Sequence, residues 1–159
     1  MTPNLTVLTD PASPAAEAYR RLRVNLTAAA KAAPLHTILM VAAGPDDAKA
    51  QAVANLAVSF ARVGSRVILA DCDLRQPGQH ALFGLDNAVG VTTALSDPRG
   101  ALPLQATVAP PLRVLTSGPA IATPGDAIAS PAMAELLARL RAEADIVLLD
   151  APPATSATD

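Results

Sequence analysis

The feature that most constrains the fold of this chain is an aliphatic run, a loop and a helical run that follow one another in its first half. The aliphatic run covers residues 37–42, and the helical run covers residues 51–58. Between them, Gly44 and Lys49 keep the spacing of the phosphate-binding motif GxxxxGK(S/T). Because that motif needs a strand before it and a helix after it, we predict a phosphate-binding loop at residues 44–51.

Three positions of this loop depart from what phosphate binding requires. Ala48 stands where the motif has glycine, and its methyl group penalises any positive φ that the loop needs. Ala50 stands where a serine or threonine hydroxyl would bind Mg²⁺. Asp46 adds a carboxylate near the phosphates, and like charges about 4 Å apart repel by about 4 kcal/mol at an effective dielectric near 20. The candidate binding residues are Gly44, Pro45, Asp46, Asp47, Ala48, Lys49, Ala50 and Gln51.

Composition limits the kinds of protein that this chain can be. Its 159 residues suffice for one domain, and its core must be aliphatic because aromatic residues make up only 2%. A net charge of −2 gives no basic surface for nucleic acid. The single cysteine, Cys72, excludes an internal disulfide and fits a reducing cytoplasm. No apolar run approaches the roughly 20 residues that cross a bilayer, so we expect a cytoplasmic chain without direct membrane insertion.

Aliphatic runs and helical patterns alternate along the rest of the chain. We predict strands at 37–42, 66–70, 112–115 and 145–150, and helices at 14–32, 49–62 and around 135–140. This alternation is typical of a parallel sheet covered on both faces. We expect residues 1–12 to form an extended arm, and Leu22 and Leu26 to lie on the apolar side of the first helix. Residues 76–131 are rich in proline and glycine and give no clear pattern.

Helix boundaries are marked by residues with special backbone preferences. Ser13 is a hydroxyl N-cap and Pro14 follows it at the first helical position, a pair that is typical of a helix start. Pro34 stops that helix, and Gly64 ends the helix that follows the phosphate-binding loop. These signals agree with the boundaries predicted from the apolar pattern.

Two acidic motifs follow predicted strands. Asp71 and Asp73 come directly after the strand at 66–70, and Asp150 ends the strand at 145–150. In an open parallel sheet, ligands bind beyond the carboxyl ends of the strands, so we expect these acids to meet the phosphate-binding loop in one crevice. Carboxylates there can hold Mg²⁺ through its water shell or accept a proton from a nucleophile. Acids also end strands for purely structural reasons, but this reading fits a single motif better than two.

With these motifs in place, the chain resembles the bacterial tyrosine kinases of exopolysaccharide and capsule synthesis, a branch of the MinD/ParA-like P-loop ATPases. The resemblance covers essentially the whole chain. It is carried by the helix at 13–26 with an ExxRxxR pattern at Glu17, Arg20 and Arg23, and by residues 71–77, 80–85, 115–119 and 150–153. Each motif alone is weak, whereas their order and spacing together are specific.

The resemblance implies an α/β fold of the P-loop NTPase type, with a mostly parallel sheet, helices on both faces and an N-terminal helical arm. Residues 1–34 would form the arm and oligomerisation helix, and residues 35–159 the kinase-like domain. The family domain continues beyond its second acidic strand, so we expect the C-terminal part of the fold to be missing from these residues. The family also has a tyrosine-rich tail, whereas the only tyrosine here is Tyr19.

The resemblance also implies a site and partners. ATP and Mg²⁺ would be the cofactors, with Lys49, Asp71 and Asp73 in catalytic roles and Asp71 and Asp150 holding the metal. Glu17, Arg20 and Arg23 would join subunits into a ring, although residues spaced by three also form ordinary solvated helix faces. A membrane-embedded polysaccharide co-polymerase would activate the protein and recruit it to the inner face of the cell membrane.

Three functions remain open on the sequence. The first is a kinase-like module that regulates exopolysaccharide or capsule synthesis and export, with impaired ATP binding and catalysis. The second is an active ATP-dependent protein tyrosine kinase of the same system. The third is a positioning ATPase of the MinD/ParA type, against which the ExxRxxR and DxDxR patterns argue. The altered loop at Asp46, Ala48 and Ala50 favours the first.

Overall fold

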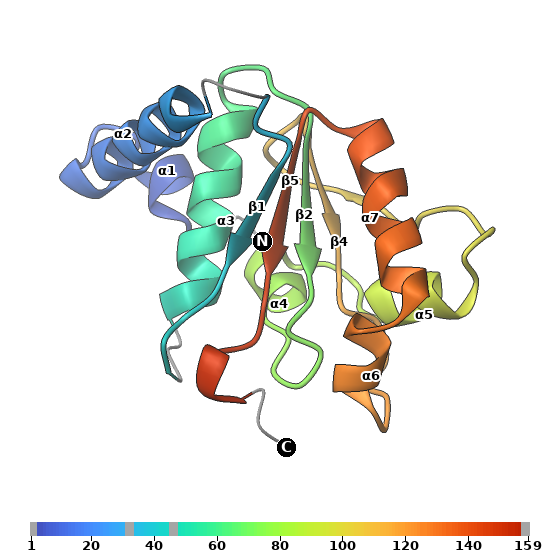
Figure 1. The fold of residues 1–159 in the computed structure, drawn as a ribbon. Coiled ribbons are helices and arrows are strands. Elements are labelled where there is room, and N and C mark those ends of the chain that lie inside the picture. The colour runs from blue at the N-terminus through green and yellow to red at the C-terminus, as the bar shows by residue number, and fades with distance from the viewer. Residues whose placement is uncertain (1–2, 31–33, 45–47, 157–159) are drawn as a thin grey trace.

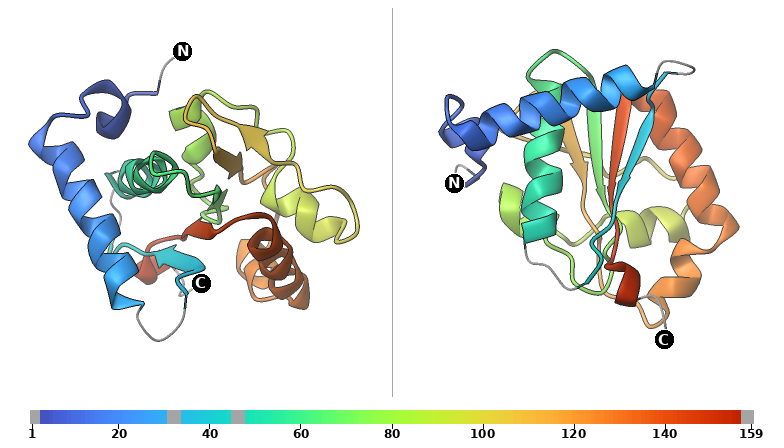
Figure 2. Two further views of the ribbon diagram at one scale, coloured as in Figure 1. Left: turned by 90° about the horizontal axis from the view of Figure 1, so that it is seen from above. Right: turned by 60° about the vertical axis from the view of Figure 1, so that its left-hand side comes forward.

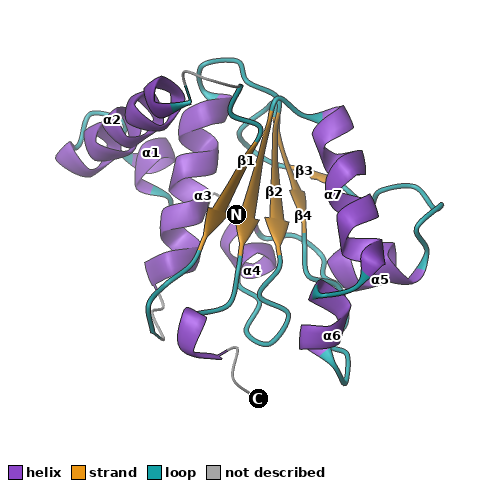
Figure 3. Ribbon diagram, viewed as in Figure 1, coloured by secondary structure: helices purple, strands orange, loops and turns teal. Residues whose placement is uncertain are grey.

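The computed structural model describes residues 3–30, 34–44 and 48–156. Within these ranges a five-stranded sheet has the strand order β1, β5, β2, β4, β3 (Figure 3). β1, β5, β2 and β4 run parallel, and the short β3 pairs antiparallel with β4 at the edge. The strands are β1 (Thr37–Met40), β2 (Val67–Asp71), β3 (Gln105–Ala106), β4 (Leu112–Leu115) and β5 (Ile146–Asp150). The predicted mostly parallel sheet is confirmed.

Helices cover both faces of the sheet (Figures 1 and 2). α3 (Ala48–Ala61) and α4 (Gln79–Phe83) pack on one face, and α1 (Thr6–Thr9) and α2 (Pro14–Ala29) form a further layer against α3. α5 (Val91–Ser96), α6 (Pro124–Ile128) and α7 (Pro131–Glu143) cover the other face, and the 3₁₀ turn η1 (Ala154–Ser156) follows β5. None of the described helices is both long and apolar enough to cross a bilayer.

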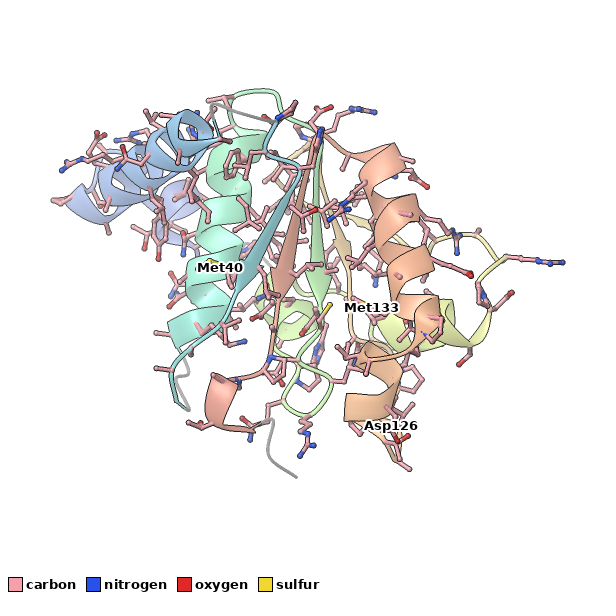
Figure 4. All side chains as sticks on the ribbon, in the orientation of Figure 1. Met40, Asp126 and Met133 are labelled. Atoms are coloured by element: carbon pink, nitrogen blue, oxygen red, sulfur yellow. The ribbon has the colours of Figure 1, made fainter. Side chains whose placement is uncertain are left out.

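The two core layers follow from the alternation of side chains along each strand. In β2, Val67 and Leu69 join the cluster under α3, whereas Ile68 and Ala70 join the cluster under α7. All five residues of β2 and of β5 are buried, which explains why these strands read as continuous aliphatic runs. Met133 on α7 and Met40 on β1 belong to opposite layers (Figure 4).

The start of α2 follows the predicted cap. The Ser13 side chain accepts a hydrogen bond from the Ala16 amide at 3.1 Å, and Pro14 is the first helical residue. The apolar side of this helix was predicted less well. Leu26 packs against the core, but Leu22 is 39% exposed, so its assignment to the apolar side is wrong. α2 touches mainly α3, and the narrow stripe that it buries there does not reach Leu22.

The expectation of an extended arm at residues 1–12 is wrong within the described part. Residues 6–9 form the short helix α1, and Leu5 and Val7 are fully or almost fully buried. Long-range contacts dock this helix on α3: the Val7 amide donates to Asn55 Oδ1 at 3.0 Å, and Arg62 donates to the Val7 carbonyl. A four-residue helix is too short to leave a periodic pattern in the sequence.

Residues 76–131 contain the three short helices α4, α5 and α6, the edge strand β3 and the strand β4. A close backbone approach organises this region. A side chain on Gly90 would lie only 2.0 Å from the Thr116 carbonyl oxygen, and the Val91 amide donates to that oxygen at 2.7 Å. Glycine at position 90 therefore allows α5 to begin directly beside the end of β4.

Candidate functional site

The carboxyl edge of the central strands brings most of the predicted acids together. Met40, Asp150 and Asp71 are register partners at the ends of β1, β5 and β2. Asp73 follows two residues after the end of β2, and Lys49 lies in the first turn of α3. Both Asp73 and Lys49 are buried at this edge. The expected convergence of the acidic motifs with the lysine of the loop is present in the structure.

Lys49 is held by this cluster. Its Nζ pairs with Asp150 Oδ1, donates to the Ala151 carbonyl oxygen, and lies 3.5 Å from Asp73 Oδ2. The side chains of Lys49 and Asp150 are 8% and 1% exposed, so the pair is shielded from water. A buried cation with three oxygen neighbours is well compensated, and removing one partner would leave a buried charge unpaired.

Asp71 is the most deeply buried acid of the cluster. Its Oδ2 accepts hydrogen bonds from the amides of Gly78 and Gln79 at 3.0 and 2.9 Å. Its Oδ1 is buried and has no partner among the described residues. Burial raises the pKa of Asp71 from 3.8 to about 7, although the two amides act in the opposite direction. Asp71 is therefore poised to exchange a proton near neutral pH.

Gln79 belongs to the same cluster, although no pattern in the sequence marks it as a site residue. Its side chain is fully buried, and its Nε2 donates to Asp150 Oδ2 at 2.7 Å and to the Ala50 carbonyl at 2.9 Å. It therefore links the acid at the end of β5 to the first turn of α3. A glutamine in a proline- and glycine-rich loop carries no periodic signal. Only its position shortly after the Asp71 motif could have drawn attention to it.

The phosphate-binding loop itself is described only at its ends. Pro45, Asp46 and Asp47 lie outside the described residues, so the predictions for them remain predictions. Ala48 begins α3, and none of the described non-glycine residues has a positive φ. The predicted backbone penalty at Ala48 is therefore wrong, because a helical residue accepts alanine readily.

The other loop residues have different surroundings. Gly44 directly precedes the undescribed segment, and a side chain there would meet no described atom within 4 Å. Ala50 lies beside the acidic cluster, and its Cβ would be 3.3 Å from a side chain placed on Gly78. Gln51 is directed elsewhere, since its Nε2 donates to the Asn4 carbonyl at 3.0 Å. In this structure the side chain of Gln51 is therefore used to hold the N-terminal segment, not a ligand.

The acidic cluster offers oxygen atoms, the type of ligand that a hard cation such as Mg²⁺ prefers. Asp71, Asp73 and Asp150 supply carboxylate oxygens, and Asp71 Oδ1 is a buried acceptor that has no described partner. No three acidic, histidine or cysteine side chains in the described ranges are arranged to hold a metal by themselves. Mg²⁺ usually takes only one or two carboxylates and completes its shell with water and phosphate oxygens. The acids therefore fit Mg²⁺, whereas Ala50 has no hydroxyl to add.

Cys72, between the two acids, does not add a reactive group. Burial and the neighbouring Asp71 and Asp150 charges raise the pKa of its thiol to about 12. A thiol in these surroundings stays protonated at physiological pH and is a poor nucleophile or metal ligand.

The residues predicted for oligomerisation lie on α2, away from the acidic cluster. Arg20 pairs with Glu17 at 2.6 Å and also donates to the Pro11 carbonyl at 2.7 Å. The Glu17 and Arg20 side chains are 49% and 40% exposed, so this pair contributes only about 0.2–0.5 kcal/mol. Arg23, one turn further on, is partly buried and does not share these contacts.

Comparison with curated proteins gives clear relatives, while no protein-family model matches the chain. The chain is 36% identical over 160 residues to tyrosine-protein kinase YwqD of Bacillus subtilis (strain 168), covering 100% of this chain and 68% of that protein. It is 32% identical over 150 residues to putative tyrosine-protein kinase EpsB of Ralstonia nicotianae, covering 94% of this chain but only 20% of that protein. The chain thus spans about two thirds of one relative and a fifth of the other.

Solved structures give the same picture. The chimerical protein CapA2B2 has a TM-score of 0.90 at 33% identity, covering 96% of this chain and 67% of that structure. The kinase domain of the Escherichia coli tyrosine kinase ETK has a TM-score of 0.86 at 28% identity, covering 93% and 58%. The Mg-ADP complex of MinD from Pyrococcus horikoshii has a TM-score of 0.61 at 23% identity, covering 75% of this chain and 49% of that structure. At this identity the comparison shows a similar fold and nothing more.

Proposed function

This chain belongs to the bacterial tyrosine-protein kinase family, and from that premise we propose that it is a kinase-like module whose nucleotide site is impaired. It would regulate the synthesis and export of an exopolysaccharide or capsule rather than phosphorylate protein efficiently. The process comes from the family resemblance, and the impairment comes from the residues of this chain. Because the chain spans only part of its relatives, the activity, substrates and partners of the whole protein remain proposals.

The single observation that carries the impairment is Ala50. It lies beside the acidic cluster, where its neighbours are Gly78 and Gln79, and its methyl group cannot bind a metal. The cluster would therefore have to hold Mg²⁺ without the hydroxyl that normally joins the metal to this helix. Asp46 adds a negative charge to the same loop, which disfavours a phosphate polyanion further.

When bound, Mg²⁺ would neutralise charge on the phosphates of ATP. Asp71 and Asp150 would hold the metal, and Asp73 would accept the proton of an attacking hydroxyl. Lys49 would have to exchange its present contacts with Asp150 and Ala151 for contacts with phosphate oxygens. That exchange is costly when Mg²⁺ is held weakly, because Asp150 would give up the buried Lys49 without a firmly bound cation in its place.

An active tyrosine kinase is the second candidate, and a specific observation favours it. Asp71, Asp73, Asp150 and Lys49 all lie at one edge of the sheet, buried and linked through Gln79 and shared contacts. Such a cluster contains the acids and the lysine that phosphoryl transfer uses. The likeness to MinD concerns the fold alone and supports no positioning function.

Titration of ATP with Mg²⁺ into the purified protein, followed by calorimetry, separates the two candidates. An impaired site predicts no saturable heat in the micromolar range. The matched control is Lys49→Ala, which removes the one loop side chain that both candidates require. Saturable micromolar binding that Lys49→Ala abolishes would establish the active kinase instead.

We also propose that the protein acts in an oligomer, recruited to the inner face of the cell membrane by a membrane-embedded co-polymerase. Glu17, Arg20 and Arg23 on α2 would join the subunits. Static light scattering of the double variant Arg20→Ala, Arg23→Ala should show a lower mass than the unchanged protein. An unchanged mass would mean that these arginines of α2 do not join the subunits.

A further inference from the structure

Gln79 is a fully buried glutamine at the carboxyl edge of the sheet. It is the first residue of α4, the short helix beside the arrowheads of β2 and β5 (Figure 1). Glutamine is mostly exposed in folded proteins, and a buried one normally has hydrogen-bond partners for its amide. The role of Gln79 therefore follows from the contacts of its amide group.

The amide nitrogen joins the acid at the end of β5 to the first turn of α3. Nε2 donates to Asp150 Oδ2 at 2.7 Å and to the Ala50 carbonyl oxygen at 2.9 Å. Because both partners are acceptors, these contacts also fix which end of the amide is the nitrogen. The other end, Gln79 Oε1, is buried and has no partner among the described residues.

A purely structural role does not explain these contacts. The Ala50 carbonyl lies inside α3, where the amide four residues later already donates to it. An apolar side chain of the same size would fill the space without leaving a buried acceptor unpaired, as Gln79 Oε1 is. The group that gains most from Gln79 is therefore Asp150, because Nε2 fixes one of its two oxygens.

The two oxygens of Asp150 have different partners. Oδ1 pairs with Lys49, whereas Oδ2 accepts the hydrogen bond from Gln79. The proposed function requires Lys49 to leave Oδ1 for a phosphate, while the contact of Gln79 with Oδ2 does not depend on Lys49. Gln79 would then hold the carboxylate in its present orientation and leave Oδ1 free for a metal ion. Hydrogen bonds to a metal-binding carboxylate orient it in this way.

Ala50 is the second partner of Gln79, and its position has a particular meaning in a phosphate-binding loop. In P-loop proteins a hydroxyl at this position and an acid at the end of a neighbouring strand hold the same Mg²⁺, so the metal connects the acid to the helix. Ala50 has no hydroxyl for such a connection. Gln79 instead connects Asp150 to the same turn of α3 by direct hydrogen bonds.

We propose that Gln79 is a positioning residue of the metal site, which orients Asp150 and provides the connection to α3 that a hydroxyl at position 50 would make. This inference rests on the proposed function, because it takes Asp150 as a holder of Mg²⁺. Two buried oxygens, Gln79 Oε1 and Asp71 Oδ1, support it because both lack a described donor. Mg²⁺ usually keeps several waters, and their O–H groups are donors of the kind that these oxygens lack.

Titration of Mn²⁺ alone into isotope-labelled protein tests the proposal, because its unpaired electrons broaden the NMR signals of nearby nuclei. In the unchanged protein we expect selective broadening of the backbone amide signals of Lys49, Gly78 and Gln79 at millimolar Mn²⁺. Gln79→Met keeps the length of the side chain but removes the donor. It should raise the Mn²⁺ concentration for half-maximal broadening by at least about tenfold. Circular dichroism during heating checks that each variant is folded.

The matched control is Gln105→Met, because Gln105 Nε2 also donates to two oxygens, the Asp86 carbonyl at 2.8 Å and Thr116 Oγ1 at 3.4 Å. Gln105 lies on β3, three strands from β5 in the sheet, which is roughly 14 Å at about 4.8 Å per strand. The control should leave the Mn²⁺ concentration unchanged. Gln79→Asn keeps the amide on a shorter side chain and should show the same loss if Gln79→Met does not fold.

Ala50→Ser tests whether Gln79 replaces the hydroxyl. With serine at position 50 the metal has its own link to α3, so Gln79→Met should cost less Mn²⁺ affinity there than beside Ala50. Equal Mn²⁺ affinities in Gln79→Met and Gln105→Met proteins, or equal losses beside alanine and serine, would overturn the proposal. So would the absence of selective broadening in the unchanged protein. Micromolar ATP binding would instead contradict the impaired site and leave the Mn²⁺ result standing.

Discussion

The acidic cluster and the first turn of α3 lie side by side, yet they differ in how many polar side chains they offer for binding a nucleotide and its metal ion. In the cluster, Asp71, Asp73 and Asp150 are buried, and each accepts at least one hydrogen bond. In the first turn of α3, Lys49 keeps its amine, whereas Ala48 and Ala50 present only methyl groups.

The difference follows from what each part does for the folded chain. The acids hold the buried Lys49, the Gln79 side chain and the amides of the turn after β2, so the fold itself needs them. The side chain of Ala50 makes no such polar contact. An acidic cluster can therefore persist for structural reasons whether or not the neighbouring loop binds phosphate, and its presence alone does not establish catalysis.

The largest effect should come from Asp150→Ala. This change leaves Lys49 buried without its main partner and Gln79 Nε2 with one acceptor fewer. We expect a loss of about 3–5 kcal/mol in the free energy of unfolding, measured by urea denaturation. Asp145→Ala is the control, because Asp145 forms its ion pair with Arg66 at the surface and its loss should change stability little. If Asp150→Ala lowers the free energy of unfolding as little as Asp145→Ala does, the acidic cluster does not stabilise the fold.

Asp71 should make the stability of the fold depend on pH, because its carboxyl group is also buried in the acidic cluster. Burial raises the pKa of Asp71 from 3.8 to about 7, so between these pH values the folded protein holds one proton more than the unfolded chain. The stability from that proton is complete below about pH 4 and is lost as the pH rises through about 7. Over roughly three pH units, at about 1.4 kcal/mol each, the loss amounts to about 4 kcal/mol.

Asp71→Asn should remove this dependence, because its amide does not titrate there. Denaturation of both proteins between about pH 4 and pH 8 should show the variant gaining stability relative to the unchanged protein as the pH rises. Parallel curves would contradict a buried, titrating Asp71.

The smallest effect on stability should come from Ala50→Ser. The half-buried Ala50 makes no polar side-chain contact, and Gly78 leaves space beside it. We expect a change within about 1 kcal/mol in the free energy of unfolding by thermal denaturation. A much larger loss would show that alanine at this position is itself required by the fold.

Much of the fold could be predicted because its buried strands are aliphatic throughout. β2, β4 and β5 were placed to within one residue, and the helix boundaries at Ser13 and Gly64 follow residues with known backbone preferences. The docking of α1 could not be predicted, since it depends on contacts of Val7 with Asn55 and Arg62, about 50 residues away.

The candidate site was predicted in part for similar reasons. Asp71 and Asp150 end adjacent parallel strands, so their convergence follows from the topology. Gln79 joins them only through the turn that folds back after β2, which no local pattern announces.

The most direct test compares the unchanged protein with the triple variant Asp46→Gly, Ala48→Gly, Ala50→Ser in calorimetric titrations with ATP and Mg²⁺. The variant removes the added charge and restores the metal-binding hydroxyl next to an otherwise intact acidic cluster. An impaired loop predicts no saturable micromolar binding to the unchanged protein and an affinity at least about a hundredfold higher in the variant. Equal affinities in the two proteins would contradict the claim that the loop is where this site is impaired.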